Sequence, residues 1–427
     1  MLKRIKSSLF FKNFSIYFIG LLISGLISFV TIPIITQKYT VAVYGKFSLI
    51  QNVILILISF GGGWINQCVI RFNDNSTGFK INIYQIFFTV FIPLSLISLF
   101  IILFLNNNIF IAVLSISTFI LGGLSALGIV FYQSNFKAGQ TLALNLIRAS
   151  IFAGTLLFFV LFRDKIDNIF ILIVCFFLSF AISILPLLKK EFKIINQSFF
   201  TLIRRFDKRY ISNLYIENKR YFDYGWPLAL WFTISTILNV GDRYVINMFE
   251  TSYKVGVYSS IYDILSKSIT MICSPILIAG FPMMSRKFNE GRQNEALKLI
   301  CYLLIVEITL LVFTIFFVGI FKEFFLNILG VEKSAENFRL LIPLVFSVFL
   351  WQFAMLAHKP LELYEDTKFM LFAVIVSVVC NFGLNMFFIP KFGIVFAAYS
   401  SMLASVLYLL LVTAKGFILF KKNKISS

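Results

Sequence analysis

Residues 83–105 read IYQIFFTVFIPLSLISLFIILFL, without one charged side chain. An α-helix rises about 1.5 Å per residue, so about 20 mainly apolar residues cross the hydrocarbon core of a bilayer. The stretch does not alternate polar and apolar positions as a strand of a membrane barrel does. Because only helices and closed barrels satisfy every backbone group in lipid, this stretch predicts a membrane-spanning helix.

The rest of the chain repeats this pattern. Further stretches that are long and apolar enough to span a bilayer are residues 14–36, 46–68, 109–132, 141–162, 168–188, 226–249, 255–281, 296–321, 338–357, 368–389 and 393–420. The composition agrees, because 59% of residues are hydrophobic and only 13% are charged, against roughly 25% charged in soluble domains. The sequence therefore predicts an all-α integral membrane protein with about twelve transmembrane helices.

The basic residues gather in the gaps between these stretches, and the net charge is +19. With the N-terminus in the cytoplasm, the cytoplasmic gaps hold about three times as many Lys and Arg as the external gaps, which include Arg163 and Lys165. This bias predicts that both termini are cytoplasmic. The same distribution, in a sequence without a nucleic-acid-binding motif, argues against a nucleic acid partner.

The five cysteines and the first residues have simple interpretations. The cysteines lie in or beside apolar stretches without paired short spacings, so they are predicted to be small apolar side chains rather than metal ligands or disulfides. The basic start Met1–Lys6 leads into an apolar stretch that is long enough to span and is not followed by a small-residue cleavage site. We expect a first permanent helix there, not a removed signal peptide.

The longest polar stretch, residues 189–225, divides the chain into two halves, 1–188 and 226–427, with six predicted spans each. Transporters are often built from such repeated halves. A short internal repeat supports this plan. Tyr44–Ser48 opens the second span and Val255–Ser259 opens the eighth, and both place Gly beside an aromatic residue and a Ser.

Three stretches resemble a known family. They are Pro33 with Tyr44–Leu49, then Gly241–Tyr244 with Val255–Ser259, then Asn381–Asn385 with Ile389–Ile394 and Ala397–Ala398. In order and spacing they are similar to the Wzx-type polysaccharide and O-antigen repeat-unit flippases, a family of the multidrug/oligosaccharidyl-lipid/polysaccharide exporter (MOP) superfamily. The resemblance covers the whole chain in helix count and layout.

The resemblance implies two six-helix bundles around a central cavity. It also implies a flippase that works by alternating access and carries an undecaprenyl-pyrophosphate-linked oligosaccharide from the cytoplasmic to the outer leaflet. The product would be a surface polysaccharide such as lipopolysaccharide O-antigen or capsule, and the location would be the bacterial cytoplasmic (inner) membrane. Membrane lipids, a polysaccharide polymerase and a chain-length regulator are candidate partners, and no cofactor is implied.

Ionisable side chains within the spans point most directly to function, because each costs about 2.5 to 3.5 kcal/mol at a helix centre. Together with two asparagines they form the set of predicted substrate-binding and ion-coupling residues: Arg148, Asp242, Arg243, Asp263, Lys267, Glu307, Asn381 and Asn385. No metal ligands are predicted. The single histidine, His358, ends the tenth predicted span.

Arg148, Arg243 and Lys267 are predicted to form a cationic lining for the pyrophosphate, because guanidinium and ammonium groups bind phosphate oxygens. Each of them has another interpretation. Lys267 lies four residues after Asp263, so the two can pair within one helix, or Asp263 can tune Lys267 for phosphate. Arg148 can extend to the membrane interface, and Asp242 or Arg243 can pair with a neighbouring helix.

The other polar features also have two interpretations. Isolated Glu307 fits a proton-coupled step or a structural hydrogen bond. Asn381 and Asn385 share one helix face and can bond another helix or sugar hydroxyls. The basic, aromatic segment 189–225 either lies on anionic headgroups or serves as a topology signal. From Ala397, small residues recur every fourth position, which is typical of close helix packing.

Two other function classes compete with the flippase. An ion-coupled small-molecule exporter of the multidrug type would use acidic residues for cationic drugs, whereas three cations balance three acids in these spans. A flippase for lipid II stands beside the first interpretation, because its substrate is also a lipid-linked pyrophosphate. A membrane-embedded enzyme would need a cluster of catalytic acids or metal ligands, and the sequence has neither such a cluster nor a P-loop for ATP. We therefore predict a transporter and not an enzyme.

Overall fold

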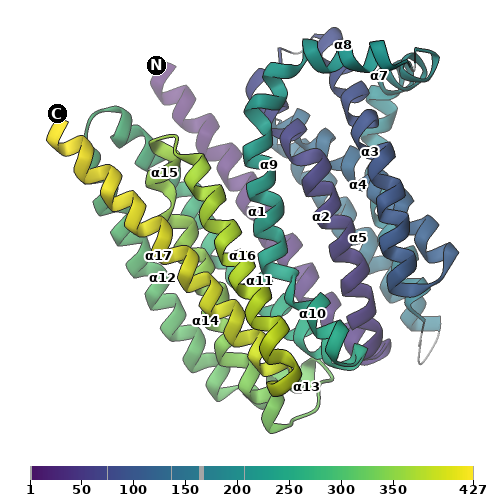
Figure 1. Cartoon of the computed structure of the whole chain (residues 1–427), viewed down its shortest axis with the longest axis vertical. Helices are drawn as coiled ribbons and strands as arrows, with labels where there is room; N and C mark the ends of the chain where they lie inside the picture. Colours follow the sequence, from purple (N-terminus) through teal and green to yellow (C-terminus); the bar gives the residue numbers. More distant parts are fainter. Residues whose placement is uncertain (1, 75, 136, 163–167, 206, 427) are drawn as a thin grey trace. The chain divides into compact units, whose positions relative to one another are not determined.

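A computed structural model describes residues 2–74, 76–135, 137–162, 168–205 and 207–426, and within them every regular element is a helix (Figure 1). Arg163 and Lys165, which the sequence assigns to an external connection, lie outside the described residues. The helices are α1 (Leu2–Lys38), α2 (Val41–Phe72), α3 (Thr77–Asn106), α4 (Ile109–Ser134), α5 (Ala138–Phe162), α6 (Ile169–Ser183), α7 (Leu185–Arg204), α8 (Lys208–Glu217), α9 (Lys219–Val240), α10 (Asp242–Phe249), α11 (Ser252–Asn289), α12 (Gln293–Ile320), α13 (Lys322–Ile328), α14 (Ala335–Ala357), α15 (Lys359–Leu363), α16 (Thr367–Phe392) and α17 (Ile394–Ser426).

The predicted spans all fall on these helices, which confirms the all-α membrane fold. Among the described residues, ten helices are long and apolar enough to cross a membrane, or up to eleven if α6 and α7, bent by 65°, count as one span. The predicted span 226–249 falls on α9 and α10, which break at Gly241. Helix α9 is not in that set, because polar residues such as Asp223 and Asn239 lower its hydropathy.

The described helices form two compact units. The described residues within 2–27, 49–162 and 168–233 make up unit 1, and those within 28–48 and 234–426 make up unit 2. Residues 28–48, which are the end of α1 and the start of α2, pack with the C-terminal helices and belong to unit 2.

Unit 1 is held together by aromatic packing at a small residue. The rings of Phe87 and Phe91 on α3 stack at 4.0 Å between centroids, and Phe91 stacks on Phe119 of α4 at 4.8 Å. A methyl group added at Gly123 of α4 would come within 2.2 Å of the Phe91 ring. Glycine at this position therefore lets α3 and α4 approach closely enough for the rings to stack.

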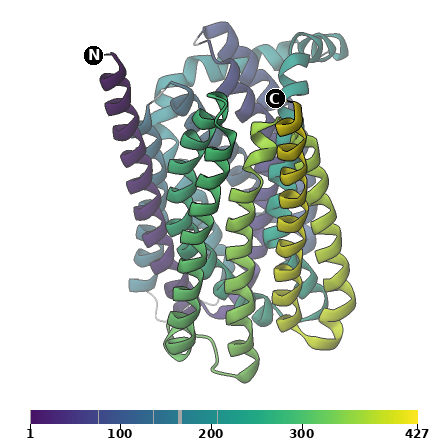
Figure 2. The same ribbon diagram turned by 90° about the vertical axis from the view of Figure 1, so that its left-hand side faces the viewer.

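Unit 2 contains the long helices α11, α12, α14, α16 and α17, of which α16 and α17 run side by side (Figure 2). The small residues Ala397, Ser401 and Ser405 of α17 are all buried. Their spacing of four residues presents one face, as expected for close packing against neighbouring helices. Helix α14 packs against α17 and is the most deeply buried of the described spanning helices.

Candidate functional site

Arg243 and Asp263 form an ion pair inside unit 2. Arg243 lies in the first turn of α10, and its Nη2 is 2.5 Å from Asp263 Oδ1 on α11, while Nη1 is 3.2 Å from Oδ2. The Tyr44 hydroxyl, at the start of α2, donates to the same Oδ2 over 2.6 Å. The Arg243 side chain is 1% exposed and that of Asp263 17%. The two-pronged geometry is the strongest form of guanidinium–carboxylate contact.

Lys267 lies one turn beyond Asp263 on α11 and is exposed. The Asp263 carboxylate pairs with Arg243. Within the described part of the chain, Lys267 makes no ion pair. The intrahelical pair, one of the two interpretations left open by the sequence, is therefore not formed. Lys267 is the charge of this cluster that is available to a ligand.

Arg148 lies on α5 in unit 1, and its side chain is half-buried. Its guanidinium carbon is 5.2 Å from the centroid of the Phe180 ring on α6, a cation–π distance. None of the described residues forms an ion pair with it. The three cations predicted to line one site thus differ in setting: Lys267 is exposed, Arg148 is half-buried, and Arg243 is buried and paired.

Asp242, the neighbour of Arg243, is the centre of a second polar cluster in unit 2. It is 1% exposed. The Tyr258 hydroxyl donates to Oδ2 over 2.6 Å, the Ser401 hydroxyl donates to the same oxygen, and the Asn385 amide donates to Oδ1 over 2.6 Å. Consecutive residues of a helix point in different directions, which explains how Asp242 and Arg243 serve two clusters.

Asn381 and Asn385 extend this cluster along α16. Asn385 Nδ2 is 3.3 Å from Asn381 Oδ1, and the Ser400 hydroxyl of α17 donates to Asn385 Oδ1. Both asparagines are buried, at 3% and 0% exposure. Of the two interpretations that the sequence allowed, bonding to another helix is the one seen in the structure.

The Asp242 cluster has the chemistry of a site for a proton or a small hard cation. A buried carboxylate is costly unless a proton or a cation neutralises it. Its neighbours Tyr258 and Ser401 contribute hydroxyl oxygens, which are ligands of hard cations. Among the described residues no group of three or more His, Cys, Asp or Glu could hold a metal ion, so a transition-metal site is not indicated there.

Glu307 stands apart from both clusters. It lies on α12, is 1% exposed, and its Oε2 has no hydrogen-bond partner among the described residues. A structural hydrogen bond through that oxygen is therefore not present. A carboxyl group in this position fits a protonated side chain better than a charged one.

The sequence did not indicate four members of these clusters as functional: Tyr44, Tyr258, Ser400 and Ser401. Signals for three of them were present. Tyr44 and Tyr258 belong to the short internal repeat, and Ser401 belongs to the small-residue stripe of the last span. Ser400 had no signal beyond its position beside Ser401.

The two copies of the repeat meet within unit 2. A methyl group added at Gly256 would come within 1.9 Å of the Val41 carbonyl oxygen, and one at Gly45 within 2.4 Å of the Ser252 carbonyl oxygen. The Ser48 hydroxyl donates to Ser259 over 3.0 Å. The first turns of α2 and α11 therefore cross at a glycine from each helix.

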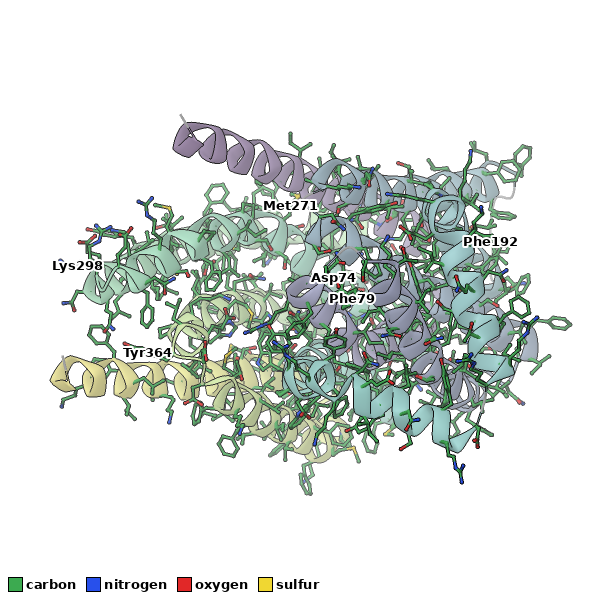
Figure 3. All side chains as sticks on the ribbon, turned by 90° about the horizontal axis from the view of Figure 1, so that it is seen from above. Asp74, Phe79, Phe192, Met271, Lys298 and Tyr364 are labelled. Carbon is green, nitrogen blue, oxygen red and sulfur yellow. The ribbon has the colours of Figure 1, made fainter. Side chains whose placement is uncertain are left out.

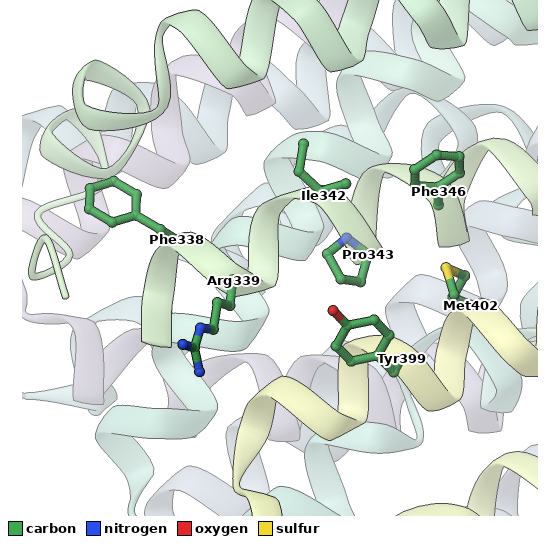
Figure 4. A pocket seen from close by; sticks show the side chains of 7 residues that line it. All are labelled: Phe338, Arg339, Ile342, Pro343, Phe346, Tyr399 and Met402. Carbon is green, nitrogen blue, oxygen red and sulfur yellow. The ribbon is translucent and has the colours of Figure 1, made fainter. Parts of the chain in front are cut away.

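Other polar or hollow places in unit 2 are less suited to transport. His358 is 1% exposed and contacts Tyr408 and Glu362, so it is held between helices. A pocket of about 380 Å³ between α14 and α17 has Arg339 as the one charged residue in a lining that is otherwise aromatic and apolar (Figure 4).

Comparison with known proteins identifies the family of the chain. The sequence profile of the family described as "Polysaccharide biosynthesis protein" matches residues 10–288. No curated protein matches the chain significantly by sequence.

Solved structures match over nearly the whole chain, with sequence identities that support a shared fold only. "Lipid II flippase MurJ, inward closed conformation" is 14% identical, with a TM-score of 0.69 over 94% of this chain and 87% of that one. An inward-facing multidrug resistance MATE family transporter of the MOP superfamily is also 14% identical, with a TM-score of 0.68 over 97% and 96% of the two chains.

A third solved structure, a MOP superfamily transporter from Pyrococcus furiosus Vc1, has a TM-score of 0.63 at 10% identity over 97% of this chain and 96% of that one. The family match and these folds confirm the resemblance seen in the sequence. The chain belongs to the polysaccharide biosynthesis protein family and has the fold of the MOP superfamily transporters.

Proposed function

We propose that this protein is a flippase for an undecaprenyl-pyrophosphate-linked oligosaccharide repeat unit, which it moves from the cytoplasmic to the outer leaflet by alternating access. The observation that carries the proposal is the match of residues 10–288 to a polysaccharide biosynthesis family, in a chain with a transporter fold. The likeness to a lipid II flippase supports a lipid-linked substrate. O-antigen, lipopolysaccharide and capsule synthesis in a bacterial inner membrane are the processes that this substrate serves.

Lys267 and Arg148 are the proposed contacts for the pyrophosphate. Lys267 is exposed, Arg148 is half-buried, and neither forms an ion pair with a described residue. The ammonium group in unit 2 and the guanidinium group in unit 1 can each bind phosphate oxygens through charge-assisted hydrogen bonds. Arg243 has a different proposed role, because its paired guanidinium holds Asp263 one turn from Lys267 and tunes the charge of that region.

The sequence has no P-loop for ATP. The energy for the transport cycle therefore has to come from an ion gradient or from the concentration difference of the substrate between the two leaflets. We place ion coupling at Asp242, with Glu307 as the second candidate. Loading of a proton or a small cation would remove the cost of the buried Asp242 carboxylate. Asp242 and Arg243 are adjacent on the short helix α10, so a movement of α10 on loading would reach the Arg243–Asp263 pair.

The function is tested in a strain that makes a defined lipid-linked repeat unit and lacks its own flippase. Expression of this chain is expected to restore the surface glycan. A fluorescent lipid-linked oligosaccharide in proteoliposomes should likewise become accessible on the opposite leaflet. Normal membrane levels of the protein without either activity would overturn the proposal.

An ion-coupled small-molecule exporter of the multidrug type is the second candidate, because the MATE fold matches almost as well as the lipid II flippase fold. The same expression strain is challenged with cationic drugs. Lower drug susceptibility without restored glycan would favour the exporter. A chain that instead supports growth after depletion of the lipid II flippase would point to lipid II as the substrate.

A further inference from the structure

Helix α7 turns away from a membrane-spanning helix. It follows α6 after the single residue Ile184, and the two axes differ by 65°. Pro186 stands in the first turn of α7, where a backbone N–H would have no partner within the helix. A span that bends this strongly at its end can place the following helix near the plane of the membrane surface.

One face of α7 is fixed to unit 1. Its buried residues recur every three or four positions: Leu187, Glu191, Ile195, Ser198 and Leu202. Lys80 of α3 forms an ion pair with Glu191 over 2.8 Å, and the ring of Phe88 on α3 is 5.1 Å from that of Phe199. Helix α7 is therefore held in one orientation, so its other sides have a defined direction.

Those other sides divide into an apolar strip and a basic strip. Leu185, Phe192 and Ile203 are exposed by 56%, 59% and 53%, and Phe192 lies at the outer edge of unit 1 (Figure 3). Their spacings of seven and eleven residues place them along one side of the helix. This division into apolar and basic strips is typical of helices that lie in a membrane interface.

The basic strip consists of Lys189, Lys193 and Arg204, whose spacings of four and eleven residues define a second side. Lys193 and Arg204 also line an open pocket of about 370 Å³, whose other lining residues are Phe192, Phe200, Asn196, Gln197 and Thr201. A pocket with two cations and two aromatic rings suits an anionic headgroup with its first methylenes.

The charges of this strip have no acidic partner in the part of the chain that the structure describes. None of Lys189, Lys193 and Arg204 forms an ion pair with a described residue. The connection between α11 and α12 is equally basic but differs in this respect. There Arg286 and Arg292 bind Glu290, and their hydrogen bonds lower the pKa of Glu290 to about 2.

We propose that α7 is an interfacial helix whose basic strip binds anionic phospholipid headgroups, while its apolar strip enters the acyl region. The occupant is a lipid surface rather than a protein, because the strip continues directly from a span and carries exposed aromatic and basic residues side by side. The binding anchors the cytoplasmic end of unit 1. It is independent of the transported substrate.

The first test titrates the purified full-length protein with phosphatidylglycerol or phosphatidylcholine and counts bound lipids by native mass spectrometry. The variant carries Lys189→Gln, Lys193→Gln and Arg204→Gln. Each basic side chain near an anionic surface contributes about a fivefold gain in affinity. We therefore expect a loss of roughly 10- to 100-fold for phosphatidylglycerol and no change for phosphatidylcholine.

The matched control removes the same net charge from paired residues, through Arg286→Gln, Lys287→Gln and Arg292→Gln. Its binding of phosphatidylglycerol is expected to stay within about twofold of the native protein. Equal losses in both triple variants would show that net charge alone attracts the lipid and would overturn the proposal. A thermal unfolding midpoint equal to that of the native protein confirms that a variant is folded.

A second measurement locates the helix in phosphatidylglycerol nanodiscs with spin labels at positions 192 and 197, after replacement of Cys301 and Cys380 by Ser. The label at Phe192 should be relaxed by oxygen, and the label at Gln197, an exposed residue on the side of the basic strip, by a water-soluble nickel complex. Two water-exposed labels, or a label at 192 that is shielded in detergent by a second copy of the chain, would overturn the proposal. Unchanged glycan export by the triple variant leaves the proposed transport function intact.

Discussion

At the scale of single residues, the Arg243–Asp263 pair shows how a charge is tolerated within a membrane domain. The Asp263 carboxylate accepts hydrogen bonds from two guanidinium nitrogens of Arg243 and from the Tyr44 hydroxyl, so three donors satisfy its oxygens. A buried pair of this kind adds little to stability over an apolar replacement, but the loss of one partner leaves the other uncompensated. The pair is therefore best tested by single and double replacements.

Replacement of Arg243 by Gln should destabilise the protein by about 3 to 5 kcal/mol, because Asp263 would keep its charge without a partner. Asp263→Asn should destabilise the protein by a similar amount, because Arg243 would then keep its buried charge without a partner. The double variant should be clearly less destabilised than the sum of the two. Thermal unfolding in detergent measures all three, and strictly additive losses would show that the two side chains do not stabilise each other.

Lys267 is expected to behave in the opposite way. Because it is exposed and makes no ion pair in the described part of the chain, Lys267→Ala should leave the unfolding midpoint almost unchanged. Flipping of the lipid-linked oligosaccharide in proteoliposomes should fall by about tenfold or more, since one charge-assisted contact to phosphate contributes about 1.5 to 3 kcal/mol.

Two further variants give this test its reference points. Lys267→Arg should retain most of the flipping, because it keeps the positive charge. Lys298→Ala, which removes an exposed lysine at the start of α12, should have no effect. Normal flipping by Lys267→Ala would remove Lys267 from the substrate site.

At the scale of elements, the crossing of α2 and α11 depends on glycine. A methyl group at Gly256 would lie 1.9 Å from the Val41 carbonyl oxygen, which is backbone and cannot move aside as a side chain can. Gly256→Ala should therefore separate the two helix starts, break the Ser48–Ser259 hydrogen bond and lower the unfolding midpoint or the yield of folded protein.

Gly383 of α16 provides the matched control, because a methyl group there would meet nothing within 4 Å. Gly383→Ala should be neutral or stabilise the protein by up to about 1 kcal/mol through higher helix propensity. A Gly256→Ala protein as stable and as active as Gly383→Ala would show that the close crossing is not required.

The elements also show what the sequence could and could not predict. Long apolar runs such as 83–105 fix helices, because lipid leaves the backbone no alternative. The breaks at Ile184 and Gly241 are different, since the predicted spans 168–188 and 226–249 run across them and packing decides where the helix ends. The cluster around Asp263 unites Tyr44, Arg243 and Asp263 from three helices. A contact across 219 residues, such as Tyr44 with Asp263, leaves no trace in local spacing.

At the scale of the whole molecule, unit 2 concentrates the buried polar chemistry described here. It contains both halves of the internal repeat, the Asp263 cluster and the Asp242 cluster. Helix α10, which is eight residues long, connects the two clusters through adjacent residues. In the proposed function, loading of Asp242 with a proton or a cation would act through α10 on the region around Lys267, which is the linkage that an ion-driven cycle requires.

Asp242→Asn tests this linkage directly. The amide has the shape of the protonated acid. Its oxygen can still accept from Tyr258 and Ser401, and its NH2 can donate to Asn385 after the Asn385 amide turns over, so the variant should fold with a similar unfolding midpoint. It can neither release a proton nor attract a cation, so it should mimic a permanently loaded site. Flipping in proteoliposomes should then no longer respond to an imposed sodium or proton gradient, whereas the native protein should respond severalfold to one of them.

Glu307→Gln is the companion variant, because Glu307 is also buried but lies outside the Asp242 cluster. If Asp242 carries the coupling ion, flipping by the Glu307→Gln variant should still respond to the imposed gradient, whereas flipping by Asp242→Asn should not. The reverse pattern would transfer the coupling role to Glu307. A response that survives in both variants would mean that neither buried acid carries the ion, and the link through α10 would have no part in the transport cycle.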